Sequence, residues 1–516
     1  NAAAMRLFCH GGAHRALKMQ PVILQNLPVV LVIVGLMLAM AALGTKVASR
    51  IGIPTALGFI GVGMVLGGQA DLRDSVATYE GAYSVGNIAL ALILFYGGLS
   101  TDIRRTRGIW MPSITLATAG VAIVTLTTAG IFWLVAPGVP WHVALILGAV
   151  LGSTDAASVL QVLGNERIGG RVRETIELES GLNDPMAFVL VAAFAQMATG
   201  GGFDAWSIQD IAWKMGAGAV IGLAIGWVSG LALAAFEEDS PEVYPIITIA
   251  LALLSYGAAE MLHASGLLAV FMTALTLGKS ADLPFRSTIV RFHASLAYLA
   301  EIIMFLVLGL LVQPQALMEP RLVGAGIFLA LALAFVSRPV AVMSILLPFG
   351  YSVRESVAVA WLGLRGAVPI ILMTIPLLSA HSAEVSGQMS RAFAVVFVCV
   401  VVGSIIPGAT VRWTMRLLRL RLPPAPRPST SIDMITKTPL DTRMMMMVVQ
   451  PGAPIEGKTL TEARIPGEIT VALVIRGTRT QRVRGDTRFE AGDEVAISLT
   501  ERLVPVAGRL FGEAHE

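Results

Sequence analysis

Charged side chains are scarce in this chain of 516 residues. Asp, Glu, Lys and Arg make up only 14% of it, whereas hydrophobic residues make up 55%, and the mean hydropathy is +0.75. A water-soluble protein with so few charges could not cover its surface, so most of the chain is expected to face lipid. The formal net charge of +3 is too small to indicate a nucleic-acid partner.

Cysteine is almost absent as well. Cys9 lies near the start of the chain, and Cys399 lies inside an apolar run. Two distant thiols make neither a disulfide framework nor a metal site. The chain also lacks a Gly-x-Gly-Asp segment, which argues against an intramembrane aspartyl protease built on Asp155 and Asp184.

Long apolar runs are what the sequence has in abundance. Runs of roughly 17–25 residues, enough for a helix to cross a bilayer, recur from Val22 to about Pro407. They predict an all-α polytopic membrane protein with about thirteen transmembrane helices. The runs begin near Val22, Pro54, Val85, Ile109, Val143, Ile176, Ile211, Tyr244, Ser265, Ser295, Leu322, Val357 and Ala392. Those near Tyr244 and Ser265 can also be read as one broken span.

Basic residues gather in alternate loops between these runs. Because positive loops stay cytoplasmic, we expect these loops and the C-terminus on the inside of a bacterial inner membrane. The acidic loop at 237–239 is an exception to the pattern. The basic loop residues are Lys46, Arg50, Arg104, Arg105, Arg107, Arg167, Arg171, Arg173, Lys279, Arg286, Arg291, Arg354, Arg412, Arg416, Arg419 and Arg421.

The composition changes after Arg421. A Pro-rich linker follows, and then turn signals separate two expected strands, Thr470–Arg476 and Glu494–Leu499. We therefore divide the chain into an N-terminal extension at 1–20, a transmembrane domain at 21–421, a linker at 422–443 and a small cytoplasmic α/β domain at 444–516. Met19 is the expected natural start.

Ionisable groups inside transmembrane spans are costly and indicate function. The fifth run contains Thr154-Asp155, and the sixth contains Glu179-Ser180-Gly181-Leu182-Asn183-Asp184-Pro185. On a helix, Ser180 and Asp184 share a face. Small residues around Asp155 allow unwinding that frees carbonyl oxygens for a cation. We interpret the two acids as a carboxylate-centred cation site, rather than as paired structural groups of a helix bundle.

Two arginines lie in later spans, and a buried guanidinium requires an acid. We expect Arg338 to pair with Glu179. Glu301, in the tenth run, is left either for Arg365 or for the wall of a cavity. The sequence does not decide between these two roles.

A second interruption by glycine and proline falls at Gly363–Pro369, which includes Gly366. It lies in a hydrophobic run seven runs after the interrupted one that holds Asp155. Matched interruptions in two halves indicate an inverted repeat, with the substrate site where the unwound parts meet.

These segments resemble the sodium/proton exchanger superfamily, in cation:proton antiporter family 1 and among its bacterial NhaP-type potassium/proton members. The pattern Glu-Ser-x-x-Asn-Asp, after a Thr-Asp in the preceding span, is specific to it. The resemblance covers about Val22 to Leu418. The matching residues are Thr154-Asp155, Glu179-Ser180, Asn183-Asp184, Arg338, the run at 363–368, His263–Gly266 and Phe305–Gly309.

The resemblance implies a homodimer of dimerisation and core domains, with two crossing broken helices and elevator-like alternating access. It implies that Asp184 carries the cation and the proton, and that Thr154, Asp155 and Ser180 complete the site. Asn183 and the Glu179–Arg338 pair would support it. Asn183 stands where the electrogenic branch has a second acid, which implies electroneutral exchange.

The C-terminal module resembles the C-terminal lobe of regulator-of-potassium-conductance domains, through the strand Ile469–Arg476 and the turns at 485–487 and 492–493. Such lobes dimerise, and some bind small nucleotides or ions. The presence of this module favours K+ over Na+ as the cation exchanged for H+. It also leaves a ligand-gated cation efflux channel as the alternative. Membrane lipid is the expected surrounding, and no cofactor is expected beyond the transported ions and a nucleotide at this module.

Overall fold

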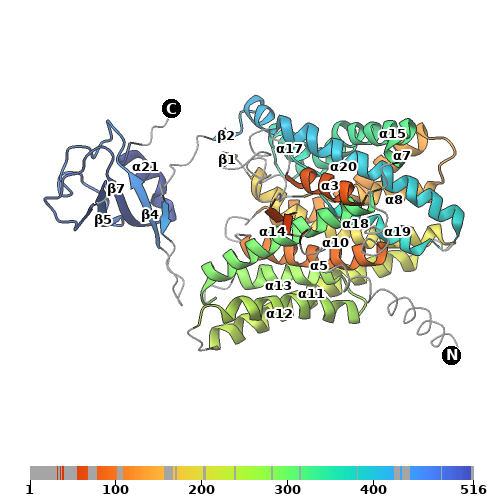
Figure 1. Cartoon of the computed structure of the whole chain (residues 1–516), viewed down its shortest axis with the longest axis horizontal. Coiled ribbons are helices and arrows are strands. Elements are labelled where there is room, and N and C mark those ends of the chain that lie inside the picture. The colour runs from red at the N-terminus through yellow and green to blue at the C-terminus, as the bar shows by residue number, and fades with distance from the viewer. Residues whose placement is uncertain are drawn as a thin grey trace.

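A computed structural model gives the arrangement of the chain (Figure 1). It describes residues 32, 35–36, 38–39, 55–67, 78–101, 108–155, 167–168, 171–200, 205–236, 240–279, 283–312, 315–380, 382–422, 430–432, 442–477 and 479–512. The expected N-terminal extension, most of the first apolar run, the acidic loop at 237–239 and the Pro-rich linker segment lie outside these residues.

The larger part of the chain is a body of packed helices (Figure 1). Two short π-helices, Leu116–Gly120 and Leu333–Ser337, connect α6 to α7 and α15 to α16. The helices are α3 (Thr55–Gly67), α5 (Tyr79–Ser100), α6 (Trp110–Thr115), α7 (Val121–Val135), α8 (Trp141–Val150), α10 (Val172–Ala198), α11 (Ala205–Ala235), α12 (Val243–Met261), α13 (Gly266–Lys279), α14 (Arg286–Leu311), α15 (Pro320–Ala332), α16 (Arg338–Leu346), α17 (Val353–Trp361), α18 (Val368–Leu372), α19 (Thr374–Ser379) and α20 (Ala383–Leu417).

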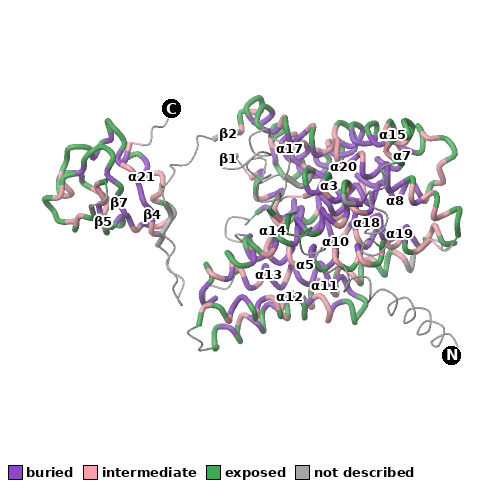
Figure 2. The backbone as a smooth tube through the Cα atoms, viewed as in Figure 1, coloured by how far each residue is buried: buried purple, intermediate pink, exposed green. Residues whose placement is uncertain are grey.

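Within the described part of the chain, eight helices are long and apolar enough to cross a membrane, and three further apolar helices are shorter. Large apolar side chains lie exposed on the outside of this body, among them Leu134, Trp227 and Leu254. Figure 2 shows the buried residues concentrated between the helices and the exposed ones around them. A helical membrane domain is thus confirmed, and the number of spans stays a prediction.

The runs near Tyr244 and Ser265 form two helices and not one broken span. The chain turns at His263, whose φ of 54° lies in the left-handed region and cannot continue an α-helix. The amide of Gly266, the first residue of α13, then donates to the Glu260 carboxylate at 3.1 Å. This turn lets α13 pack back against α12.

The start of α10 is tied to the turn between α16 and α17. The Arg171 guanidinium donates to the Gly350 carbonyl at 2.9 Å and lies 4.1 Å from the centre of the Tyr351 ring. The Tyr351 hydroxyl is in turn 2.8 Å from Oγ1 of Thr175, one turn into α10. Ser352 and Glu355 form a capping box that begins α17. These contacts fix α10 to α17 at one end of the body.

The small domain is a five-stranded antiparallel sheet with one short helix, α21 (Val504–Leu510). Its strand order is β3-β4-β7-β5-β6. The strands are β3 (Thr430–Ile432), β4 (Thr442–Val448), β5 (Thr470–Arg476), β6 (Arg479–Gln481) and β7 (Glu494–Thr500). Both strands expected from the sequence are confirmed as β5 and β7. Strand β3 lies inside the segment expected to be a linker, so the sheet begins before residue 444.

The core of this domain explains the methionine-rich start of β4. Met445 and Met447 are buried in one apolar cluster with Phe489, Ile497 and Phe511. Strand β7, which pairs with β4 on one side and β5 on the other, supplies the centre of the sheet. The domain therefore has a hydrophobic core of its own.

One pattern in this domain was overlooked in the sequence. Residues 452–459 match the letters of a phosphate-binding loop, Gly-x-x-x-x-Gly-Lys-Thr. In the structure they form a series of turns and are not followed by a helix. The amide of Gly452 donates to the Glu456 carboxylate within the segment. The segment lacks the architecture of such a loop.

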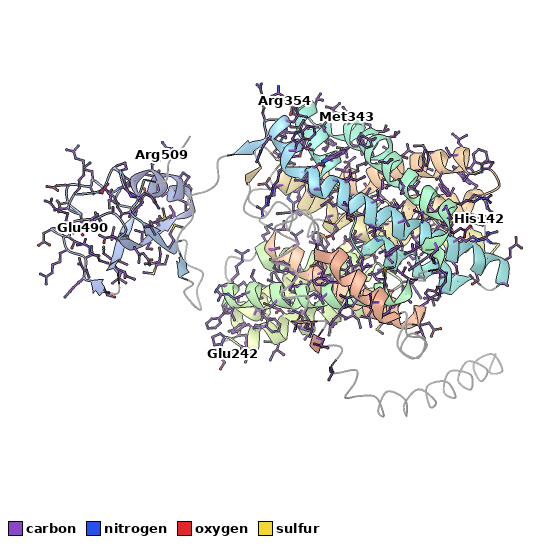
Figure 3. The ribbon with its side chains drawn as sticks, turned by 45° about the horizontal axis from the view of Figure 1, so that its top comes forward. His142, Glu242, Met343, Arg354, Glu490 and Arg509 are labelled. Atoms are coloured by element: carbon purple, nitrogen blue, oxygen red, sulfur yellow. The ribbon has the colours of Figure 1, made fainter. Side chains whose placement is uncertain are left out.

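A two-residue ribbon links the helical body to the chain that leads to the small domain. Strand β1 (Arg167–Ile168), which precedes α10, pairs antiparallel with β2 (Arg421–Leu422), which follows α20. In Figure 3, Arg354 and Glu242 lie at the end of the helical body nearer the small domain, and His142 lies at the opposite end. The small domain is thus on the side of the expected cytoplasmic loops.

Candidate functional site

Helix α10 brings four polar side chains into the interior of the body. Glu179, Ser180, Asn183 and Asp184 are all buried, in two i,i+4 pairs along one stretch of the helix. Pro185 lies inside the helix and has no N–H. In an α-helix the carbonyl that loses its partner is that of Gly181, four residues earlier. The helix is therefore weakened next to its acids.

Opposite α10, two interrupted helices meet. Helix α8 ends at Val150, and the chain continues without helix through Ser153, Thr154 and Asp155. Helix α17 ends at Trp361, and residues 363–366 have no helical structure before α18 begins. The Asp155 amide donates to the Leu364 carbonyl at 2.9 Å. The two unwound segments thus cross in contact, as the matched glycine and proline interruptions predicted.

Gly366 is the second close contact of this crossing. A Cβ atom at this position would collide with the Asp155 carboxylate. Only glycine therefore lets the second unwound segment approach the acid of the first. The sequence singled out Gly366 as part of a broken helix but did not indicate this neighbour.

Thr154 joins the first unwound segment to α10 through three hydrogen bonds. Its carbonyl accepts from Oγ of Ser180 at 2.6 Å, and its Oγ1 accepts from Nδ2 of Asn183 at 2.6 Å. Its amide makes a longer contact, 3.5 Å, to Oδ1 of Asn183. These bonds hold three of the expected site residues, Thr154, Ser180 and Asn183, together, and Asp184 is the next residue of α10.

Asp184 is the acid at the centre of this arrangement. Its side chain is only 4% exposed. Within the described part of the chain, Oδ1 of this carboxyl has no hydrogen-bond partner. The charges of Asp155, Arg365 and Glu179 act on it. A buried carboxyl oxygen that is left unpaired is unfavourable unless a proton or a cation completes it.

Arg338 and Glu179 form the predicted ion pair. The two side chains are bonded through both ends of the guanidinium, at 2.5 and 2.7 Å, and are 3% and 0% exposed. A Cβ atom at Gly363 would lie 2.6 Å from Nε of Arg338, so this glycine gives the arginine room to reach the acid. The pair ties α16 to α10 immediately beside Ser180.

Arg365 lies in the second unwound segment and is also buried. Its Nη1 donates to the Gly363 carbonyl at 2.7 Å, while Nε and Nη2 have no hydrogen-bond partner in the described residues. Its charge interacts with Glu179 and Asp184. Glu301 is buried on α14, and its role, as a partner of Arg365 or as part of a cavity wall, stays a prediction.

One contact of the site was missed in the sequence. The Ser404 hydroxyl, on α20, donates to the Arg365 carbonyl at 2.5 Å and so holds the second unwound segment against α20. A serine in a long apolar helix is weak evidence on its own, because such a hydroxyl usually bonds to its own helix. Ser404 also makes that bond, to the Val400 carbonyl at 2.7 Å.

Two interrupted helices that cross beside buried carboxylates are the architecture of an ion-coupled secondary transporter. Residues 32–417 match the family described as sodium/hydrogen exchanger, transmembrane, and residues 444–512 match the TrkA-C domain. The chain belongs to the sodium/hydrogen exchanger family.

Similar proteins include two named bacterial antiporters. The K+/H+ antiporter NhaP2 of Shewanella baltica is 33% identical over 487 residues, which are 93% of this chain and 82% of that protein. The K+/H+ antiporter NhaP of Alkalimonas amylolytica is 32% identical over 497 residues, 94% of this chain and 83% of that protein.

Solved structures show the same fold. The sodium proton antiporter MjNhaP1 of Methanocaldococcus jannaschii at pH 8 superposes with a TM-score of 0.66 and 24% identity, and the match covers 76% of this chain and 99% of that one. The helical membrane fold inferred from the apolar runs is therefore confirmed.

Proposed function

We propose that this chain exchanges a monovalent cation, K+ in preference to Na+, for H+ across a bacterial inner membrane. The observation that carries the proposal is the Oδ1 atom of buried Asp184, which has no hydrogen-bond partner among the described residues. Asp184 follows Asn183, whose amide bonds to Thr154 of the first unwound segment. We expect oxygen atoms of Asp155, Thr154 and Ser180 to complete a cation site with it; the bonds of Thr154 to Ser180 and Asn183 and the charge of Asp155 acting on Asp184 support this set. The two similar bacterial proteins named as K+/H+ antiporters support the choice of K+.

The mechanism follows from competition for one carboxylate. A proton or a cation neutralises the Asp184 charge, whereas the empty carboxylate leaves an unpaired charge in the membrane. If only the neutralised forms reorient between the two sides, each cation that moves one way is matched by protons moving the other way. No ATP is needed, because the gradient of one ion drives the other.

The stoichiometry is proposed to be one for one. Asn183 donates to Thr154, so it supports the site as a neutral amide and adds no second titrating group on α10. We further propose elevator-like alternating access in a homodimer. We also propose that the small domain lies in the cytoplasm; its position at the end of the helical body that carries Arg354 supports this (Figure 3).

The test is cation-triggered proton flux in proteoliposomes that contain a pH-sensitive dye. K+, Na+ and Li+ are added in turn to the wild-type protein, to Asp184→Asn and to Asp210→Asn. Asp210 is the control, because it is a carboxylate on α11 that pairs with Lys214 at 2.6 Å, away from the site. We expect the wild type and Asp210→Asn to exchange, with K+ most effective, and Asp184→Asn to be inactive.

Three other outcomes of this experiment would each change a different part of the proposal. Substantial exchange by folded Asp184→Asn would remove Asp184 from its role. Rapid cation flux that is independent of protons would support the cation channel, for which the TrkA-C domain is the observation in favour. A response only to Na+ or Li+ would leave the antiport in place and overturn the selectivity.

A further inference from the structure

Two groups of helices are each joined internally by hydrogen bonds from side chains to other helices. The site-bearing group contains the segment after α8 together with α10, α16, α17 and α20. Its links are Ser180–Thr154, Glu179–Arg338, Trp361–Thr410 and Ser404–Arg365. The outer group contains α11, α12, α13 and α14, and its links are Thr273–Gly222, Ser255–Thr273 and Thr248–His293. Both site carboxylates belong to the first group.

Helix α13 is locked within the outer group and against α5. A Cβ atom at Gly98 of α5 would lie 2.6 Å from the Phe271 carbonyl oxygen, and one at Gly226 of α11 would lie 2.7 Å from Cβ of Thr276. Backbones that approach so closely interlock with the side chains of the facing helix. Phe271 is therefore held at its own backbone by α5, and its helix is held by α11.

The ring of Phe271 points the other way, onto the site-bearing group. It rests on Gly181 of α10, where any Cβ atom would collide with the ring. The ring is 1% exposed. At this contact an apolar ring of α13 packs on the backbone of α10 at a glycine.

This contact lies beside the cation site. Gly181 and Asp184 are three residues apart and share a face of α10, so the Phe271 ring covers the helix face that carries the acid. In the other direction, Phe188 is one turn beyond Asp184, and the centre of its ring is 6.3 Å from that of Tyr83 on α5. Aromatic contacts with α5 and α13 thus bracket Asp184 on both sides along the helix.

We propose that Phe271 is the gate residue of the cation site and that Gly181 is its seat on the moving helix. An apolar ring excludes a hydrated cation as long as it rests on the glycine. Asp184 becomes accessible from the side of Gly181 when α10 shifts along α13 and the ring leaves its seat. The Phe188–Tyr83 contact closes the side toward the other end of α10. This proposal rests on the exchange function proposed above, and it names the residues that control access to it.

The first test measures access directly and needs no transport. In a background with Cys9→Ser and Cys399→Ala, Ser180→Cys places a thiol next to Gly181. Its rate of reaction with a small, positively charged methanethiosulfonate is compared with and without Phe271→Ala. Because the rate follows the population of the open site, we expect an increase of about tenfold or more. Phe95→Ala is the matched control: Phe95 is a fully buried phenylalanine of α5 that packs on His293, and it should leave the rate unchanged.

The second test makes Gly181 larger and Phe271 smaller. Gly181→Ala alone should reduce exchange by about tenfold or more, and adding Phe271→Ala should restore much of it, as expected for two residues in direct contact. Leu277→Ala, on the same helix, should give no rescue. If Gly181→Ala does not fold, the thiol reaction still decides.

The outcomes separate the two proposals. Equal thiol reaction rates with and without Phe271→Ala, or the same increase in Phe95→Ala, would overturn the gate. Loss of exchange in Gly181→Ala that Phe271→Ala does not restore, in folded protein, would overturn it as well. Absence of exchange in the wild type with every cation would overturn the function, while the thiol reaction would still show whether Phe271 closes the site.

Discussion

The backbone amide of Asp155 donates a hydrogen bond to the carbonyl of Leu364 at 2.9 Å, and this bond joins the two unwound segments at their crossing. Neither residue contributes a side chain to it, so it survives any exchange of side chains that leaves the backbone in place. With Ser404 holding the next carbonyl, that of Arg365, the crossing is fixed from two directions. We expect both segments to move as one unit during transport.

Replacing Gly366 by alanine should weaken cation binding while leaving the protein folded. The new Cβ would occupy the space of the Asp155 carboxylate, so this acid must move away from Asp184. We expect the cation concentration for half-maximal exchange to rise by about tenfold, the scale of one lost charge-assisted contact. Gly403→Ala on α20 is the control, because nothing lies within 4 Å of its added methyl group. An unchanged half-maximal concentration in Gly366→Ala would contradict the role given to Asp155.

Breaking the Arg338–Glu179 pair should destabilise the protein strongly. Glu179→Gln leaves a guanidinium that is 3% exposed without its counter-charge, at a cost of about 3–5 kcal/mol. The double variant Glu179→Gln/Arg338→Gln should recover part of this loss, since it leaves no unpaired charge. Thermal unfolding in detergent measures the wild type, Glu179→Gln, Arg338→Gln and the double variant. Losses that simply add in the double variant would show that the two residues do not act as a pair.

Asn183→Asp should make transport sensitive to membrane potential. The substitution adds a carboxylate beside Asp184, so the empty site would carry one more negative charge. Electrical recordings on proteoliposomes adsorbed to a solid support measure this charge movement. The wild type should give no net current and the variant a transient current upon addition of cation. A current in the wild type would refute one-for-one exchange. Asp210→Asn, outside the site, should behave as the wild type does.

The C-terminal domain should lose stability in acid through one ion pair. Asp493 is 1% exposed and accepts from Nε and Nη2 of Arg476 at 2.7 and 2.8 Å. Burial alone would raise the pKa of Asp493, but the bonds from Arg476 and from the Glu490 amide outweigh it and lower the pKa below its ordinary value. The pair therefore stabilises the domain at and above the ordinary aspartate range, and the stabilisation is lost as the pH falls through the lowered pKa.

Arg476→Gln removes this pair without adding a charge. We expect a loss of about 1.5–3 kcal/mol at neutral pH, typical of a hydrogen bond to a charged group, and a smaller difference from the wild type in acid. Hydrogen exchange of the β5 and β7 amides in the full chain measures it. Arg509→Gln, at the exposed end of α21, is the control; Figure 3 labels Arg509 and Glu490 in this domain. Equal protection in Arg476→Gln and wild type would show that the Arg476–Asp493 pair does not stabilise the domain.

Much of the site could be read from the sequence because it depends on rare residues. Ionisable side chains in apolar runs are few, so Asp184, Glu179 and Arg338 stood out, and charge balance alone predicted the pair that the structure shows. The interruption at 363–369 was also readable, since a proline within an apolar run ends a helix. These inferences rest on ionisable residues and proline, which are conspicuous within runs of apolar residues.

The rest depends on which residues meet in space, and common residues do not reveal that. The chain has 52 glycines, so nothing in the sequence marks Gly181 as the seat of Phe271 or Gly366 as the neighbour of Asp155. Strand β3 was missed because a three-residue edge strand has no periodicity to detect.

The short ribbon between Arg167–Ile168 and Arg421–Leu422 turns the polypeptide between them into a closed ring. The chain that leads to the small domain is therefore joined not only to α20 but also, through the β1–β2 pair, to the chain that leads into α10. On the α10 side, Arg171 follows Ile168 by three residues and donates to the Gly350 carbonyl. The ribbon thus connects the chain that leads to the small domain with the start of the helix that carries Asp184.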